Sequence, residues 1–145
     1  MMSAIIRAAL VLGLTAAPAL AQVKVSACEG FRASAENVYW TDPTRTFANG
    51  AIRLVALDTQ EPVCCVLSVM VVSPSKDEPF PQCRLVSTES GGWANMFLSR
   101  AKAQYDPVKG LSVAIPVETY VDGVNNHATT VTVTINQATG EIVAR

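Results

Sequence analysis

Two adjacent cysteines, Cys64 and Cys65, lie in the apolar stretch EPVCCVLSVMVV and strongly constrain how this chain can fold. The other two cysteines are Cys28 and Cys83. A bond between neighbours is disfavoured, because Cα atoms joined by a trans peptide lie ~3.8 Å apart and a disulfide usually needs at least ~4.4 Å. We therefore expect each member of the doublet to pair with one of the two distant cysteines.

The residues around the doublet support this expectation. The run VCCVLSVMVV is rich in Val and Leu and predicts a strand that is apolar on both faces. Neighbouring side chains of a strand point to opposite faces, so Cys64 and Cys65 should reach opposite sides of a sheet. Each bond then closes a loop of roughly 20 to 37 residues, worth ~3–4 kcal/mol. Which cysteine pairs with Cys28 stays open.

Residues 1–21 are typical of a signal peptide. Arg7 precedes an apolar run from Ala8 to Ala17, and the segment ends in Ala-Leu-Ala, the small-x-small form of a cleavage site. The run is shorter than the ~20 apolar residues that span a bilayer, so we expect no transmembrane anchor in the mature chain. An even number of cysteines in an exported chain also favours disulfides, and we expect a periplasmic or secreted protein.

Residues 22–145 are expected to form a single domain of ordinary size. Without Arg7 the chain has ten basic and twelve acidic residues, which gives a net charge of about −2, and the charges are interspersed. A basic stripe is missing, so nucleic acid is an unexpected partner. The sequence has neither a C-x-x-C nor an H-E-x-x-H motif nor a Gly-rich phosphate loop, and we expect no metal and no cofactor.

Turn signals and alternation predict a mainly β fold, an antiparallel sandwich or open barrel. DPVKG (106–110) and NQATG (136–140) each place a turn-opening Asp or Asn ahead of a glycine, and NG (49–50) is a hairpin signal. Val and Ile alternate with Thr in residues 128–136, which indicates a strand with one wet face. Pro116 cannot donate to a ladder, so its strand should lie at an edge or carry a bulge there.

Two segments are ambiguous. Residues 93–105 fit both a helix and a strand, and we prefer a strand for the second half because the DPVKG turn needs one to precede it. Ser26 and Glu29 form a capping-box pattern, which allows a short N-terminal helix near residues 27–36, with an irregular arm as the alternative.

Two stretches are candidates for binding a partner or ligand. SPSKDEPFPQC (73–83) predicts a surface loop in which Phe80 stands between two prolines, and prolines lower the entropy lost when such a loop is ordered. The alternative is a plain loop whose Phe80 folds back on the sheet. In NVYWTDPTRTF (37–47), Tyr39 and Trp40 precede a turn and could line a ligand surface, although aromatic residues also serve as packing.

Catalytic constellations are weak. Ser90 in TESGGW resembles the nucleophile motif of chymotrypsin-like serine proteases over a few residues, but His127, the sole histidine, follows the serine and the mature chain is too short for that fold. The favoured interpretation is an exported, non-catalytic binding or accessory module that contacts a protein of the cell envelope or a small ligand. The alternative is a small periplasmic enzyme, hydrolytic or redox, that uses His127 with Ser90 or a free cysteine.

Overall fold

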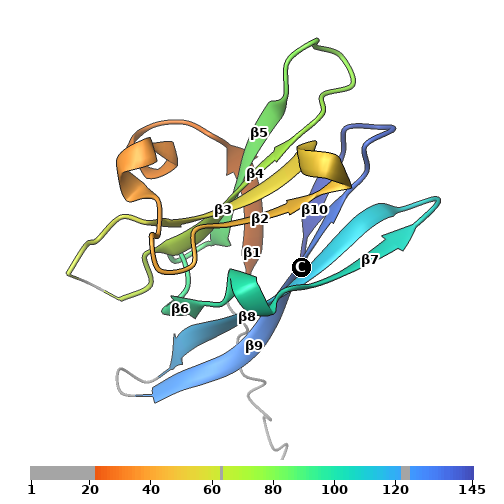
Figure 1. Cartoon of the computed structure of the whole chain (residues 1–145). Helices are drawn as coiled ribbons and strands as arrows, with labels where there is room; N and C mark the ends of the chain where they lie inside the picture. The colour runs from red at the N-terminus through yellow and green to blue at the C-terminus, as the bar shows by residue number, and fades with distance from the viewer. Residues whose placement is uncertain (1–21, 63, 122–124) are drawn as a thin grey trace, which may run out of the picture.

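Two antiparallel sheets face each other in the computed structural model, which describes residues 22–62, 64–121 and 125–145 (Figure 1). The predicted signal peptide, residues 1–21, lies outside the described residues. The prediction of a mainly β, sandwich-like fold with two disulfides is confirmed, and the sheets do not close into a barrel. In the described part of the chain, no helix has the length and apolar character to cross a membrane.

The first sheet contains five strands in the order β1-β5-β4-β3-β2. Strands β2 to β5 follow one another as a meander, and the N-terminal strand β1 completes the sheet beside β5, far from it in sequence. The strands are β1 (Val23–Ala27), β2 (Thr44–Phe47), β3 (Ile52–Asp58), β4 (Leu67–Ser73) and β5 (Gln82–Thr88).

The second sheet has the order β10-β9-β8, and the other edge of β8 is shared by the short strands β6 and β7. A 3-10 turn, η4 (Leu98–Arg100), separates those two strands, so the preferred strand in the second half of residues 93–105 is confirmed. The strands are β6 (Asn95–Met96), β7 (Lys102–Asp106), β8 (Gly110–Val121), β9 (Asn125–Ile135) and β10 (Ile142–Ala144).

Alternating apolar side chains from both sheets meet in the core between them. Val131, Val133 and Ile135 of β9 are at most 1% exposed, whereas the threonines between them are exposed or half-buried, as the alternation predicted. Residues of the central strands supply most of the rest: Ile52, Leu54, Ala56, Leu67, Val69, Val71, Val113, Ile115 and Val117.

The expectation for Pro116 is wrong. Pro116 lies in the middle of β8, a twelve-residue strand that pairs with β9 along its length, opposite Thr130. A proline is tolerated there because the other neighbour of β8 is interrupted at this point, between β6 and β7. The proline carbonyl accepts a hydrogen bond from the Phe97 N–H, 3.0 Å away. Because the ladder on this side of β8 is interrupted between β6 and β7, strand pairing does not require the backbone N–H that Pro116 lacks.

Two of the three predicted hairpin turns, 106–110 and 136–140, share one mechanism. The Oδ1 atom of Asp106 accepts the N–H groups of Val108 and Lys109, both at 2.8 Å. Asn136 makes the equivalent bonds to residues 138 and 139, at 3.0 and 3.2 Å. The hydrogen bonds from the Lys109 and Val108 N–H groups stabilise the charged carboxylate of Asp106 and lower its pKa below the ordinary value of 3.8. The charge of Lys109 makes a smaller contribution in the same direction.

The N-terminal arm between β1 and β2 contains two 3-10 turns, η1 (Phe31–Ala33) and η2 (Ala35–Asn37), in place of an α-helix. The capping box does not form, because Ser26 belongs to β1 and its hydroxyl lies 3.5 Å from the Leu85 carbonyl. The buried Asn37 side chain donates to the Phe31 carbonyl at 2.6 Å and holds the two turns together.

The predicted cysteine pairing is wrong. The structure joins Cys28 to Cys83, with Cα atoms 5.6 Å apart, and Cys64 to Cys65. The first pair follows from register: Ala27 pairs with Arg84 across β1 and β5, so the next residues along meet. The doublet precedes β4, which begins only at Leu67, so the alternation of a strand does not apply to it. Cys65 has a φ of 78°.

Removing each disulfide in turn tests whether one bond joins distant segments and the other only neighbouring residues. The Cys28–Cys83 bond spans 55 positions of sequence, so replacing both cysteines with serine should lower the free energy of unfolding by about 3–4 kcal/mol. The Cys64→Ser/Cys65→Ser double variant is the matched control and should lose less than about 1 kcal/mol, because a bond between neighbours closes almost no loop. Urea unfolding measures both values, and equal losses would contradict the assignment.

The two hairpins also predict a local pH effect. Because the folded pKa of Asp106 is lowered, its stabilisation of the first turn is complete above pH 3.8 and is lost as the pH falls through the lowered pKa. Protection of the Val108 and Lys109 amides against hydrogen exchange, taken relative to the intrinsic exchange rate at each pH, should therefore fall in acid. The backbone N–H groups of residues 138 and 139 are bound by the side chain of Asn136, which does not titrate in this pH range. Their protection relative to the intrinsic exchange rate should therefore not change.

Candidate functional site

Phe80 is 73% exposed in loop 74–81, which connects β4 and β5. The alternative in which this ring folds back on the sheet is wrong. The hydroxyl of Ser75 accepts the N–H groups of Asp77 and Glu78, which orders the first half of the loop. The loop extends beyond the ends of β4 and β5 (Figure 1).

Both ends of this loop are held by other parts of the fold. The Gln82 side chain donates to the carbonyls of Pro74 and Gly140, at 3.2 and 2.6 Å, and so joins the loop to the turn before β10. One residue later, Cys83 is bonded to Cys28. The loop therefore presents Phe80 from a fixed base, and ordering it against a partner would need little further entropy.

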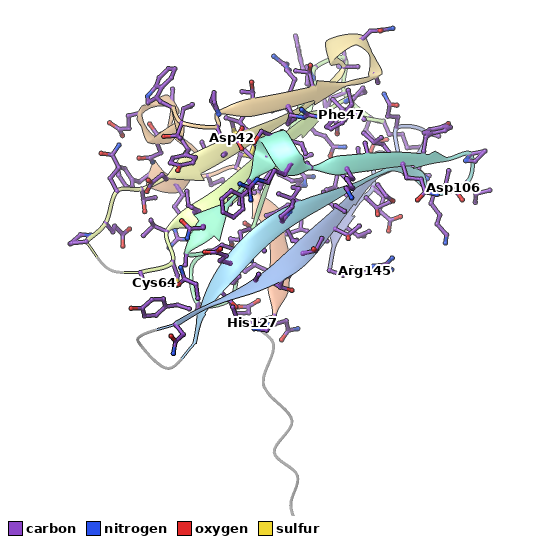
Figure 2. All side chains as sticks on the ribbon, turned by 60° about the horizontal axis from the view of Figure 1, so that its bottom comes forward. Asp42, Phe47, Cys64, Asp106, His127 and Arg145 are labelled. Carbon is purple, nitrogen blue, oxygen red and sulfur yellow. A yellow bond between two sulfur atoms is a disulfide. The ribbon has the colours of Figure 1, made fainter. Side chains whose placement is uncertain are left out.

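Tyr39 and Trp40 behave differently from each other. Tyr39 is half-buried and packs against the core, and its N–H donates to the Ala56 carbonyl at 2.9 Å. Trp40 is 79% exposed in the turn that follows. The carboxylate of Asp42 accepts the Ser99 N–H at 2.7 Å, which fixes this turn to η4 of the other sheet; Figure 2 shows Asp42 beside that turn of helix.

The structure does not gather the three predicted residues into one site. Loop 74–81 leaves the end of the first sheet at which Arg53 pairs with Val72. The turn with Trp40 is instead attached near Ala56, farther along β3 and on the side of β2. Phe80 and Trp40 are therefore separate exposed aromatics, and only Phe80 lies next to the long-range disulfide.

A polar pocket of about 430 Å³ lies over the outer face of the first sheet beside β1. Lys24 and Ser87 pair across β1 and β5 and face outward, since the next pair, Val25 and Val86, faces the core. Arg32 of the arm reaches over the pocket, and its Nη1 donates to the Gly91 carbonyl. Glu29 and Glu89 also line the pocket, and the Glu89 carboxylate lies 3.9 Å from the Lys24 ammonium, so positive and negative side chains are mixed here.

One wall of this pocket belongs to the turn at Gly91 and Gly92, which packs against the cysteine doublet. A Cβ on Gly92 would lie 2.3 Å from the Leu67 carbonyl oxygen and 2.8 Å from that of Cys65. This close approach lets Trp93 bond to Leu67 in both directions, at 2.8 and 3.1 Å. The second glycine of this turn is needed because it contacts the backbone of another segment.

The residues of the alternative enzyme are not joined. Ser90 is exposed and its hydroxyl lies 3.0 Å from that of Thr88. His127 is exposed on β9, opposite Thr119 (Figure 2). Among the described residues, no hydrogen bond connects it to Ser90. All four cysteines are in disulfides, so the structure offers no free cysteine to this hypothesis. Within the described ranges, no group of three or more metal-ligating side chains is placed to hold a metal ion.

Sequence reasoning missed two features of these surfaces. Phe31, three residues beyond Cys28, is 58% exposed on the arm. The pocket at Arg32 depends on an arm that folds back over β1 and β5, a contact between distant segments without a local sequence signal.

The chain matches no protein-family model, and no significant match was found among curated proteins or solved structures. The case for a function therefore depends on the residues described above.

The Gly91–Gly92 turn leads to a stability prediction. Gly92→Ala places a methyl group against two backbone carbonyls that cannot move independently, and should lower the free energy of unfolding by at least about 2 kcal/mol. Gly50→Ala is the control, because no atom lies within 4 Å of its Cβ position and only its φ of 87° opposes the change. Thermal unfolding of both variants measures the difference. A Gly92→Ala protein as stable as the control would contradict the close approach.

Proposed function

We propose that this protein is an exported, non-catalytic binding module that contacts a protein partner of the cell envelope through loop 74–81, with Phe80 as the anchor. The observation that carries the proposal is the 73% exposure of an aromatic ring between two prolines, on a loop held at both ends. Large aromatic side chains contribute most of the binding energy in many protein interfaces. Loops on rigid scaffolds commonly carry such contacts.

The remaining parts of the proposal have separate support. Residues 1–21 have the pattern of a signal peptide, and two disulfides are compatible with an exported protein. A binding role is favoured over catalysis because, among the described residues, no hydrogen bond joins Ser90 to His127. The polar pocket at Arg32 leaves room for a small polar ligand as a second contact.

The test compares two exposed aromatics. The native protein, Phe80→Ala and Tyr105→Ala are each used to capture partners from an envelope extract, and the captured proteins are quantified by mass spectrometry. Tyr105 is 67% exposed on β7, in the other sheet, so its variant is the matched control. We expect Phe80→Ala to reduce capture of a specific partner at least tenfold, about 1.4 kcal/mol, and the control to retain it.

Stability of the same proteins separates binding from packing. Because Phe80 is already exposed, its truncation should leave the melting temperature nearly unchanged. A loss of about 3 kcal/mol or more, the effect of removing a core phenylalanine, would show that the ring packs against the fold. Equal loss of capture by Phe80→Ala and Tyr105→Ala would also refute the loop as the specific site.

A further inference from the structure

The bond between Cys64 and Cys65 differs from the other disulfide in its exposure at Cys64, in its position and in the length of chain that it closes. It joins neighbours in sequence and lies in the segment before β4, outside both sheets. Cys64 is exposed, whereas Cys28 and Cys83 are both half-buried. Exchange begins with attack of a thiolate on an accessible sulfur, and exposed bonds are the labile ones in exported proteins. An attacking thiol can therefore reach the doublet more easily.

Opening this bond would not remove a brace from the fold. The bond closes almost no loop of chain, so it restricts the unfolded state very little. The Cys28–Cys83 bond, by contrast, spans 55 positions and continues the pairing of β1 with β5. The two disulfides thus divide into one that holds distant segments together and one that can open while the sandwich persists.

The backbone of the doublet also contacts a second feature. Cys65 has a φ of 78°, a left-handed conformation that residues other than glycine seldom adopt. Its carbonyl oxygen lies 2.8 Å from the Cβ position of Gly92 and 3.4 Å from that of Gly91. Gly91 in turn accepts the hydrogen bond from Arg32 in the wall of the polar pocket. The backbone of Cys65 therefore contacts the Gly91–Gly92 turn directly, and this turn forms part of the pocket wall.

We propose that Cys64–Cys65 is a thiol–disulfide exchange site for a dithiol reductant, and that opening it displaces the Gly91–Gly92 turn beneath Arg32. The reductant thiolate bonds to the Sγ of Cys64, and Cys65 leaves as a thiolate. The second thiolate of the reductant then attacks the reductant sulfur that is bonded to Cys64, and Cys64 leaves as a thiolate. Two electrons pass to the protein, each cysteine takes up a proton, and the reductant leaves as a disulfide.

The exchange step is tested on the native full-length product purified without reductant. Dithiothreitol is added without denaturant, new thiols are alkylated at intervals, and the labelled peptides are quantified by mass spectrometry. We expect Cys64 and Cys65 to be labelled at least tenfold faster than Cys28 and Cys83, with an unchanged far-UV circular dichroism spectrum. The proposal is overturned if Cys28 and Cys83 are labelled as fast, or if the doublet is labelled only after urea unfolds the protein.

The coupling is tested by NMR on the selectively reduced protein. Reduction should shift the amide signals of Gly91 and Gly92 and the Nε–H signal of Arg32, and leave those of the β8–β9 ladder in place. The Cys64→Ser/Cys65→Ser variant should show the same shifts without reductant. Unchanged signals at all three residues would refute the coupling, and this outcome does not depend on loop 74–81 or on its partner.

Discussion

The close approach of Gly92 to the carbonyl of Leu67 is the constraint on which the joining of the two sheets depends. It lets the chain leave β5, turn, and pair with β4 through Trp93 before continuing to the other sheet, where the Ala94 N–H donates to the Glu118 carbonyl at 2.8 Å. Trp93 is only 2% exposed and fills the core at this crossing. A side chain larger than hydrogen at position 92 would separate these segments at the point where their hydrogen bonds are made.

Local patterns predicted the second sheet well. The alternation in residues 128–136 and the openers Asp106 and Asn136 each act through neighbours in sequence, so the sequence contains all the information needed. Pro116 was misjudged for the opposite reason. Its tolerance depends on a gap between β6 and β7, and no pattern within its own strand records where a neighbouring strand is interrupted.

The cysteines show the same limit at the candidate sites. The expected pairing assumed that the strand began before the doublet, and a start at Leu67 removes the alternation on which that assumption stood. The correct partner of Cys28 follows from the register of β1 against β5, which is a long-range property. The exposed position of Phe80 was foreseeable from its prolines and charged neighbours, whereas the pocket beneath Arg32 requires the path of the arm in three dimensions.

The position of β1 has a consequence for the order in which the chain acquires its structure. Val23, close to the start of the described chain, pairs with Thr88, so β1 is synthesised first but has no neighbour until β5 has followed. Contacts between such distant residues slow folding, and an unpaired strand is exposed to other chains meanwhile. The segment β2–β5 can form its meander first, and β1 then attaches to the free edge of β5. Closure of the Cys28–Cys83 bond would make this late attachment difficult to reverse.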